Sequence, residues 1–231
     1  MTFKIITLFP SLFDSVFSQS IIKRAIEKKL IEIKLINLRD FALDSYGTVD
    51  DKPYGGGTGM LLMAEPIFKA LRSLDVEPLK SKRTKDDSKI LLTTPRGHQL
   101  NQAKIRDFSH LSELIIICGR YEGVDERIHK FVCDEEVSVG DYVLTGGEIP
   151  AMVIVDSITR LLEGVLAKKD ATTKESFSEN LLEYPQYTRP ENFEGLEVPK
   201  ILLSGNHKEI ENWQFNEAKK VTSQKRPDLV T

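Results

Sequence analysis

The chain has 231 residues, of which 40% are hydrophobic and 29% charged, and its formal net charge at pH 7 is −3. These values suit one α/β core with a small second unit, and they exclude wholesale disorder. No stretch approaches the ~18 apolar residues of a membrane span, and the first residues do not resemble a signal peptide. Cys118 and Cys133 are too few for a disulfide framework. We therefore expect a soluble cytoplasmic protein with no membrane partner.

Short apolar runs alternate with amphipathic segments over the first half of the chain. Strands are predicted at residues 3–9, 31–36, 89–93 and 114–118. Helical segments are predicted at residues 10–29, 64–74, 101–108 and 149–162. The last two strands are continuous apolar runs, which are typical of parallel strands buried on both faces. This order predicts an α/β fold with a mostly parallel sheet.

The composition changes after Gly164. Residues 168–176 are polar and lack apolar anchors, which predicts a flexible connector. Further along, Asn206 is expected to cap a helix over residues 208–220. We therefore expect an α/β domain over residues 1–164, a linker over 165–177 and a small helical domain over 178–231.

The last part of the chain carries a local excess of positive charge. Between Pro199 and Arg226 there are six basic side chains and three acidic ones. Such an excess can bind phosphate groups even on an acidic protein. A solvated helix face explains the same charges equally well.

Three glycine-rich turns stand out, at residues 54–60, 118–127 and 138–150. Glycine permits positive φ and lets a ligand approach the backbone. The first turn is neither a Walker A loop nor a dinucleotide fingerprint. The second follows the strand at 114–118 directly, at the end of the strand where open α/β sheets bind ligands. Each turn alone also fits a purely structural role as a tight loop or helix entry.

The combination of these turns is more specific than each one alone. Its segments are Pro53-Tyr54-Gly55-Gly56-Gly57-x-Gly59-Met60, Gly119-Arg120-Tyr121-Glu122-Gly123, Gly140-Asp141-Tyr142-Val143-Leu144-x-Gly146-Gly147-Glu148 and Tyr187-Thr188-Arg189-Pro190. In this order they resemble the bacterial tRNA (guanine-N1)-methyltransferases of the SPOUT superfamily, and the resemblance covers essentially the whole chain. It implies a deep trefoil knot in the sheet domain, which periodicity does not show.

The resemblance implies an enzyme that transfers a methyl group from S-adenosyl-L-methionine to N1 of the guanine 3′-adjacent to the anticodon of tRNA. Family members are homodimers in which each site combines the knotted domain of one subunit with the C-terminal domain of the other. The resemblance also suggests that Mg²⁺ assists. The four histidines are scattered, with no metal-ligand spacing, so no metal-binding residue is predicted.

By resemblance, three segments of the chain form the donor pocket. The predicted donor-binding residues are Leu92, Thr93, Thr94, Pro95, Gly119, Tyr121, Glu122, Val139, Gly140, Tyr142, Leu144, Gly146 and Gly147. Apolar members of this set can line a slot for adenine. Arg96 departs from the family pattern, because it places a charge where the family has glutamine.

Methylation at N1 needs a base that takes the N1 proton and a cation or donor that stabilises charge on O6. By resemblance these roles map to Glu175 and Arg160. Glu175 stands where the best-known members have aspartate, and Glu179 is a less favoured substitute. A solvated linker carboxylate is the alternative interpretation of Glu175. A helix C-terminal arginine favoured by the dipole is the alternative for Arg160.

The substrate is a folded RNA whose target base must leave the stack. The predicted substrate-binding residues are Asp51, Gly55, Gly59, Arg189, Lys208 and Lys219, with Lys220 as a further candidate for a phosphate contact. Two other functions stay open at this point. One is a superfamily enzyme that methylates the ribose 2′-OH, and the other is a non-catalytic tRNA-binding protein.

Overall fold

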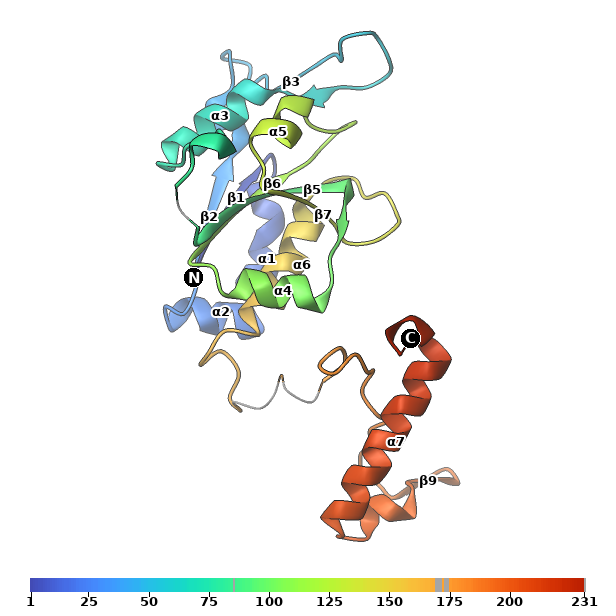
Figure 1. The fold of residues 1–231 in the computed structure, drawn as a ribbon. Helices are drawn as coiled ribbons and strands as arrows, with labels where there is room; N and C mark the ends of the chain where they lie inside the picture. The colour runs from blue at the N-terminus through green and yellow to red at the C-terminus, as the bar shows by residue number, and fades with distance from the viewer. Residues whose placement is uncertain (85, 169–171, 173–174, 231) are drawn as a thin grey trace. The chain divides into compact units, whose positions relative to one another are not determined.

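The computed structural model describes residues 1–84, 86–168, 172 and 175–230 (Figure 1). The chain divides into two compact units, Met1–Leu166 and Ala167–Thr231. Residues 169–171 and 173–174 of the predicted linker lie outside the described part of the chain. Within the described part, no helix has both the length and the apolar character that a membrane span requires.

A five-stranded sheet forms the centre of the first unit (Figure 1). The strand order is β2-β1-β6-β5-β7, and every neighbouring pair is parallel. The strands are β1 Thr2–Thr7, β2 Glu32–Asn37, β5 Ser88–Gln99, β6 Glu113–Cys118 and β7 Glu135–Ser138. The predicted α/β fold with a mostly parallel sheet is confirmed. The sequence pattern does not predict β7, because this strand is short and begins with two glutamates.

Alternate side chains of the central strand enter two separate apolar layers. Leu114, Ile116 and Cys118 of β6 pack into one cluster, whereas Ile115 and Ile117 pack into the other. Side chains of a strand point to opposite faces in turn, so the sheet has a core on each side. All five side chains are at most 3% exposed. The continuous apolar runs of the sequence therefore correspond to strands covered on both faces, as expected.

Helices cover both faces of the sheet (Figure 1). The buried residues of α1, α2, α4 and α6 belong to the first cluster, and those of α3 and α5 mainly to the second. The helices are α1 Asp14–Phe17, α2 Ser20–Glu27, α3 Ala64–Ser73, α4 Gln102–Ser109, α5 Glu126–Phe131 and α6 Glu148–Thr159, with 3-10 turns at Pro10–Phe13, Leu38–Phe41 and Lys80–Lys82. The helical stretch predicted over residues 10–29 is divided, since Ser20 has a φ of 54° that a continuous right-handed helix does not accommodate.

The strand β5 departs from a regular ladder near its C-terminal end. Thr93 and His98 both pair with Val137 of β7, so residues 94–97 bulge out between them. Gly97 lies directly against β7, where a Cβ would come within 2.4 Å of the Val137 nitrogen. The bulge places residues 94–96 at the carboxyl edge of the sheet, where α/β proteins bind their ligands.

The second unit is built around one long helix, α7 His207–Lys225. Asn206 caps it as predicted, since its side-chain oxygen accepts a hydrogen bond from the Glu209 N–H at 3.4 Å. The unit also contains a small hairpin, β8 Asn192–Phe193 with β9 Leu196–Glu197, and 3-10 turns at Lys200–Leu203 and Pro227–Leu229. Thr222 is fully buried, and its hydroxyl oxygen accepts from the Leu182 N–H at 2.8 Å. This bond ties the segment before the hairpin to the helix.

Candidate active site

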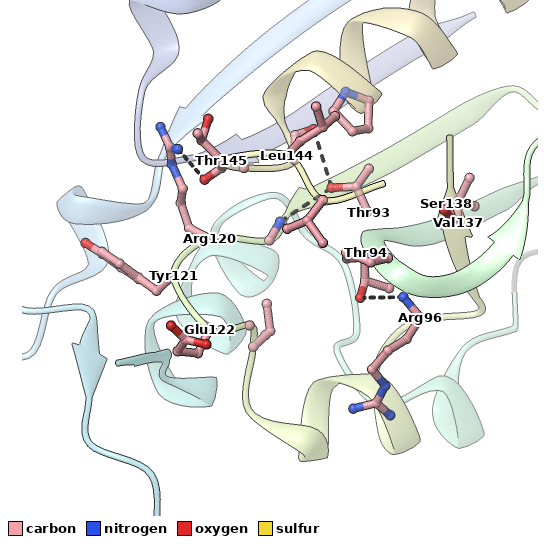
Figure 2. A pocket seen from close by; sticks show the side chains of 18 of the residues that line it. Thr93, Thr94, Arg96, Arg120, Tyr121, Glu122, Val137, Ser138, Leu144 and Thr145 are labelled. Carbon is pink, nitrogen blue, oxygen red and sulfur yellow. Dashed lines mark hydrogen bonds between the residues drawn. The ribbon is translucent and has the colours of Figure 1, made fainter. Parts of the chain in front are cut away.

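A cavity of about 410 Å³ lies at the carboxyl edge of the sheet (Figure 2). Its walls come from the β5 bulge, the turn after β6 and the segment between β7 and α6. The predicted donor-binding residues that line it are Thr93, Thr94, Pro95, Gly119, Tyr121, Glu122, Val139, Gly140, Tyr142, Leu144, Gly146 and Gly147. The volume falls in the range of small-molecule sites.

Leu92 is the one predicted donor-binding residue that does not line this cavity. It is 0% exposed and packs in the core layer that α3 and α5 cover. Side chains alternate along β5, so Leu92 faces this layer while Thr93, its neighbour, reaches the cavity.

The three walls are joined by hydrogen bonds, one between backbone groups and two through the Thr93 hydroxyl. The Gly147 N–H donates to the Gly119 carbonyl at 2.8 Å. The Thr93 hydroxyl donates to the Ile117 carbonyl at 3.2 Å and accepts from the Gly119 N–H at 3.4 Å. A Cβ on Gly147 would lie 2.0 Å from the Thr93 Oγ1 and 2.7 Å from the Gly119 nitrogen. Only glycine fits at position 147, because any side chain would push the walls apart.

The segment between β7 and α6 is braced by its own tyrosine. The Tyr142 hydroxyl donates to the Val139 carbonyl at 3.1 Å. The ring covers Gly140, where a Cβ would lie 2.4 Å from the ring Cε1. Gly140 has a φ of 154°, at the margin of the region that favours glycine. The ring is 57% exposed and offers a flat apolar surface to a ligand.

Arg120 spans two of the walls. Its Nη1 donates to the Thr145 carbonyl, as Figure 2 shows. Its guanidinium carbon lies 4.6 Å from the centre of the Phe9 ring, a cation–π arrangement. On its other side the Nε lies 3.8 Å from the Glu148 Oε2. The arginine therefore links the turn after β6 to the segment that leads into α6.

Arg96 also lines the cavity, and its charge has a partner. Its Nη1 donates to the Glu126 Oε2 at 3.0 Å. Its backbone N–H donates to the Thr94 hydroxyl at 3.3 Å, as Figure 2 shows. The side-chain hydrogen bond from Arg96 holds the pKa of Glu126 below its ordinary value. Sequence reasoning did not name Glu126 as a binding residue, although it lies within the second glycine-rich turn. The pair ties the β5 bulge to the start of α5.

His129 is another cavity residue that the sequence did not indicate. It is 8% exposed, and its Nδ1 lies 2.9 Å from the Glu136 Oε2 without the alignment of a hydrogen bond. A lone histidine in an amphipathic segment carries no signal that distinguishes a cavity wall from a core position. Only the structure shows that His129 lies in the cavity wall, next to Glu136 of β7.

The two cysteines do not supply a nucleophile. Both are free and buried, as expected. Burial raises the pKa of the Cys118 thiol well above its ordinary value, and the Glu148 carboxylate raises it further. Burial likewise raises the pKa of Cys133 to about 11. Burial disfavours both thiolates, and neither cysteine lines the cavity, so neither is placed to act as a nucleophile there.

The first glycine-rich loop lies beside the cavity. The Glu122 N–H donates to the Met60 carbonyl at 3.1 Å, and a Cβ on Gly59 would lie 2.3 Å from the Glu122 Cγ. Gly55 has open space around it. Asp51 lines a second cavity of about 630 Å³ next to this loop. The predicted base-contacting segment is therefore adjacent to the predicted donor pocket.

The remaining predicted residues are not among those that line this cavity. Arg160 caps α6, is half-buried, and donates its N–H to the Asp156 carbonyl at 3.2 Å. Glu175 belongs to the second unit and is half-buried. Arg189, Lys208 and Lys219 are exposed in the same unit. The two predicted catalytic residues thus belong to different units.

The cavity combines apolar and polar walls. Glycine backbone and apolar side chains form part of its lining, and the ionisable side chains of Arg96, Arg120, Glu122, Glu126 and His129 form another part. Within the described ranges, no group of three or more histidine, cysteine, aspartate or glutamate side chains could hold a metal ion. A concave site of this composition suits a small molecule with both apolar and polar groups.

Comparisons with known proteins agree on one family. A family model described as tRNA (Guanine-1)-methyltransferase TrmD matches residues 1–231. The tRNA (guanine-N(1)-)-methyltransferase of Dictyoglomus turgidum is 54% identical over 226 residues, which are 98% of this chain and 88% of the relative. The proteins of the same name from Geotalea uraniireducens and Geobacter sp. strain M21 are 49% and 51% identical, each over 100% of this chain and over 91% and 90% of the relative.

Proposed function

The chain belongs to the tRNA (guanine-1)-methyltransferase family, and we propose that it transfers a methyl group from S-adenosyl-L-methionine to N1 of a guanine in tRNA. The observation that carries this proposal is the convergence of three glycine-containing segments on one cavity. The family pattern assigns these same segments to the methyl donor. We infer from the family that this part of the fold carries a deep trefoil knot.

The residues of the cavity fit the methyl donor. The Tyr142 ring and Leu144 offer apolar surface for adenine. When bound, the donor supplies a methyl carbon that its sulfonium has already activated. The protein then has to bind the donor, exclude water and position the guanine.

Two side chains are proposed to act on the guanine. Glu175 takes the N1 proton, because a protonated ring nitrogen is a poor nucleophile. Arg160 stabilises the negative charge that develops on O6 as the proton leaves. The electron pair on N1 then attacks the methyl carbon, and the C–S bond breaks. No metal is required to make the methyl carbon electrophilic, because the sulfonium has already activated it.

The proposed target is the guanine 3′-adjacent to the anticodon. Lys208 and Lys219 are exposed on α7 and are proposed to contact phosphates, together with Arg189 from the same unit. Asp51, Gly55 and Gly59 lie in and next to the loop that packs against Glu122, and we propose that this loop approaches the flipped base. Such phosphate contacts make binding depend on salt concentration.

The working form is proposed to be a homodimer with shared active sites. Four apolar side chains are exposed on the neighbouring elements η1 (Pro10–Phe13), α1 and α6: Leu12 and Val16, and Ile149 and Val153. We propose that these exposed apolar side chains, on elements that contact each other, belong to the interface. Sedimentation of the Val153→Glu variant tests this proposal. A monomer supports it, and a dimer as stable as the wild type contradicts this placement of the interface.

The proposal places the protein in the cytoplasm, where its substrate is found. A contribution from Mg²⁺ is suggested by the family alone, because the described residues contain no fitting ligand group. Methyl transfer measured with added Mg²⁺ and with EDTA decides whether the ion is needed.

The test of the proposed function is transfer of labelled methyl groups to unmodified tRNA, followed by identification of the nucleoside. We expect 1-methylguanosine from the wild type and a loss of at least about 100-fold in rate for Arg160→Ala and for Glu175→Gln. A 2′-O-methyl nucleoside would indicate the ribose-modifying alternative. Binding of tRNA without transfer would indicate a non-catalytic protein, and in that case Glu175→Gln should behave like the wild type.

A further inference from the structure

A buried carboxylate lies behind the walls of the donor cavity. Glu148 is the first residue of α6 and is 2% exposed. Its Oε1 accepts a hydrogen bond from the Thr7 hydroxyl, at the end of β1, at 2.9 Å. A carboxylate removed from water is destabilising unless polar and charged partners surround it. The contacts of Glu148 should therefore explain why an acid is present at this position.

Arg120 is the charged partner of this carboxylate. Its Nε lies 3.8 Å from the Glu148 Oε2, and this nitrogen is buried without a hydrogen-bond partner among the described residues. Phe9 covers the guanidinium on one face, and the Thr145 carbonyl accepts from its Nη1. The arginine is thus held at three points, and Glu148 is the only anionic one of the three.

The backbone of the third wall is packed between these two side chains. A Cβ on Gly146 would lie 2.4 Å from the Glu148 Oε2 and 2.8 Å from the Arg120 Cδ. Gly146 and Arg120 also form an isolated antiparallel bridge. A change in the carboxylate or in the arginine therefore moves the backbone that borders the cavity.

We propose that Glu148 is a positioning residue of the donor cavity. By holding Arg120 and Thr7, it fixes the separation between the turn at residues 119–123 and the segment at 144–147. The backbone groups of these segments line the cavity, whereas Glu148 itself does not. Glu148 therefore acts through Arg120 and touches no substrate. This inference rests on the proposed function, because it concerns the binding of the methyl donor.

The test is a double-mutant cycle on the full chain with S-adenosyl-L-homocysteine as the probe, measured by titration calorimetry. Glu148→Gln keeps the shape and the Thr7 acceptor but removes the charge. We expect the Kd of the probe to rise about tenfold, which lies within the range of couplings between residues in contact. Arg120→Met should raise the Kd by a similar factor. Because both changes break the same contact, the Kd of the double variant should not exceed the larger of the two single-variant values. In steady state, the donor KM should rise more than kcat falls.

A matched control separates positioning from general stability. Glu113 pairs with Lys4 at 2.6 Å, with side chains 19% and 11% exposed, at the opposite end of the strands. Glu113→Gln should lower Tm and leave the Kd of the probe unchanged. If Glu148 only stabilised the fold, Glu148→Gln would lower Tm but would change the Kd no more than Glu113→Gln does.

The outcomes are distinct. A folded Glu148→Gln variant that binds the probe within twofold of the wild type overturns the inference, and so does an additive double variant. If Glu148→Gln does not fold, the Kd values of Arg120→Met and Thr7→Val test the inference instead, because each variant removes one contact of the carboxylate. A wild-type chain that does not bind the probe overturns the proposed function instead.

Discussion

The two units of the chain bury their apolar side chains to very different extents. The first unit has a core layer on each face of its sheet, with Phe3, Phe13 and Phe108 almost fully buried. In the described part of the second unit, Ala218 is the only buried hydrophobic residue. Apolar burial is the main driving force of folding. The cavity of the first unit is therefore set by dense packing, whereas the second unit, which we propose to bind tRNA, has almost no apolar core in its described part.

The largest effect is expected from a methyl group added inside the cavity walls. Gly147→Ala places a Cβ against the Thr93 hydroxyl and the Gly119 nitrogen. Overpacking of this kind costs about 1–3 kcal/mol, and we expect the cost to fall on the donor-bound form, so donor affinity should fall about 5- to 150-fold. Calorimetry with S-adenosyl-L-homocysteine measures it. Gly205→Ala is the control for donor affinity, because Gly205 lies in the second unit and its φ of 72° makes the substitution strain that unit and not the cavity walls. Normal affinity of Gly147→Ala would show that the walls are not rigid.

A change in the second unit should affect tRNA binding and leave donor binding unchanged. Thr222→Val keeps the shape of the side chain and removes the hydroxyl that accepts from Leu182. The half-buried Leu182 N–H left without this partner should destabilise this unit by about 1–2 kcal/mol. We expect the KM for tRNA to rise and the donor Kd to stay constant. Thr222→Ser retains the hydroxyl and should behave like the wild type. An equal loss of donor binding would show that the two units are not separable.

A surface cluster of the first unit should give a smaller, pH-dependent effect. Burial raises the pKa of Glu135, but hydrogen bonds from Lys104 and Lys89 outweigh it and leave the pKa below the ordinary value of 4.5. The folded state therefore holds the charged form more strongly than the unfolded chain does. The resulting stability is complete at neutral pH and is lost as the pH falls below 4.5.

Denaturant unfolding of Glu135→Gln checks this expectation. The variant should be about 1 kcal/mol less stable than the wild type at neutral pH. The difference should shrink as the pH falls. A difference that is constant with pH would mean that the ion pairs to Lys89 and Lys104 do not contribute.

The smallest effect is expected from Arg96→Gln, which restores the residue common in the family. Arg96 and Glu126 have side chains 62% and 48% exposed, and ion pairs this exposed contribute at most about 1 kcal/mol. Donor affinity should therefore change less than about fivefold. A loss larger than tenfold in a binding titration would show that Arg96 contacts the donor directly.

Much of the fold could be predicted from local patterns. The apolar runs at 89–93 and 114–118 correspond to β5 and β6, and Asn206 caps α7. Local patterns failed where structure depends on distant partners. The strand β7 is held by its pairing with β5 and has little apolar signal of its own. The bulge of β5 likewise depends on Val137, far along the chain.

Residue type and order are enough to predict the alternation of strands and helices, the glycine segments and the family. Only the folded chain shows which of those residues share a cavity. In the folded chain Leu92 packs in the core, Arg96 pairs with Glu126, and Glu148 is buried next to Arg120. These contacts join residues far apart in the chain, and their energies depend on burial and distance, which no local pattern encodes.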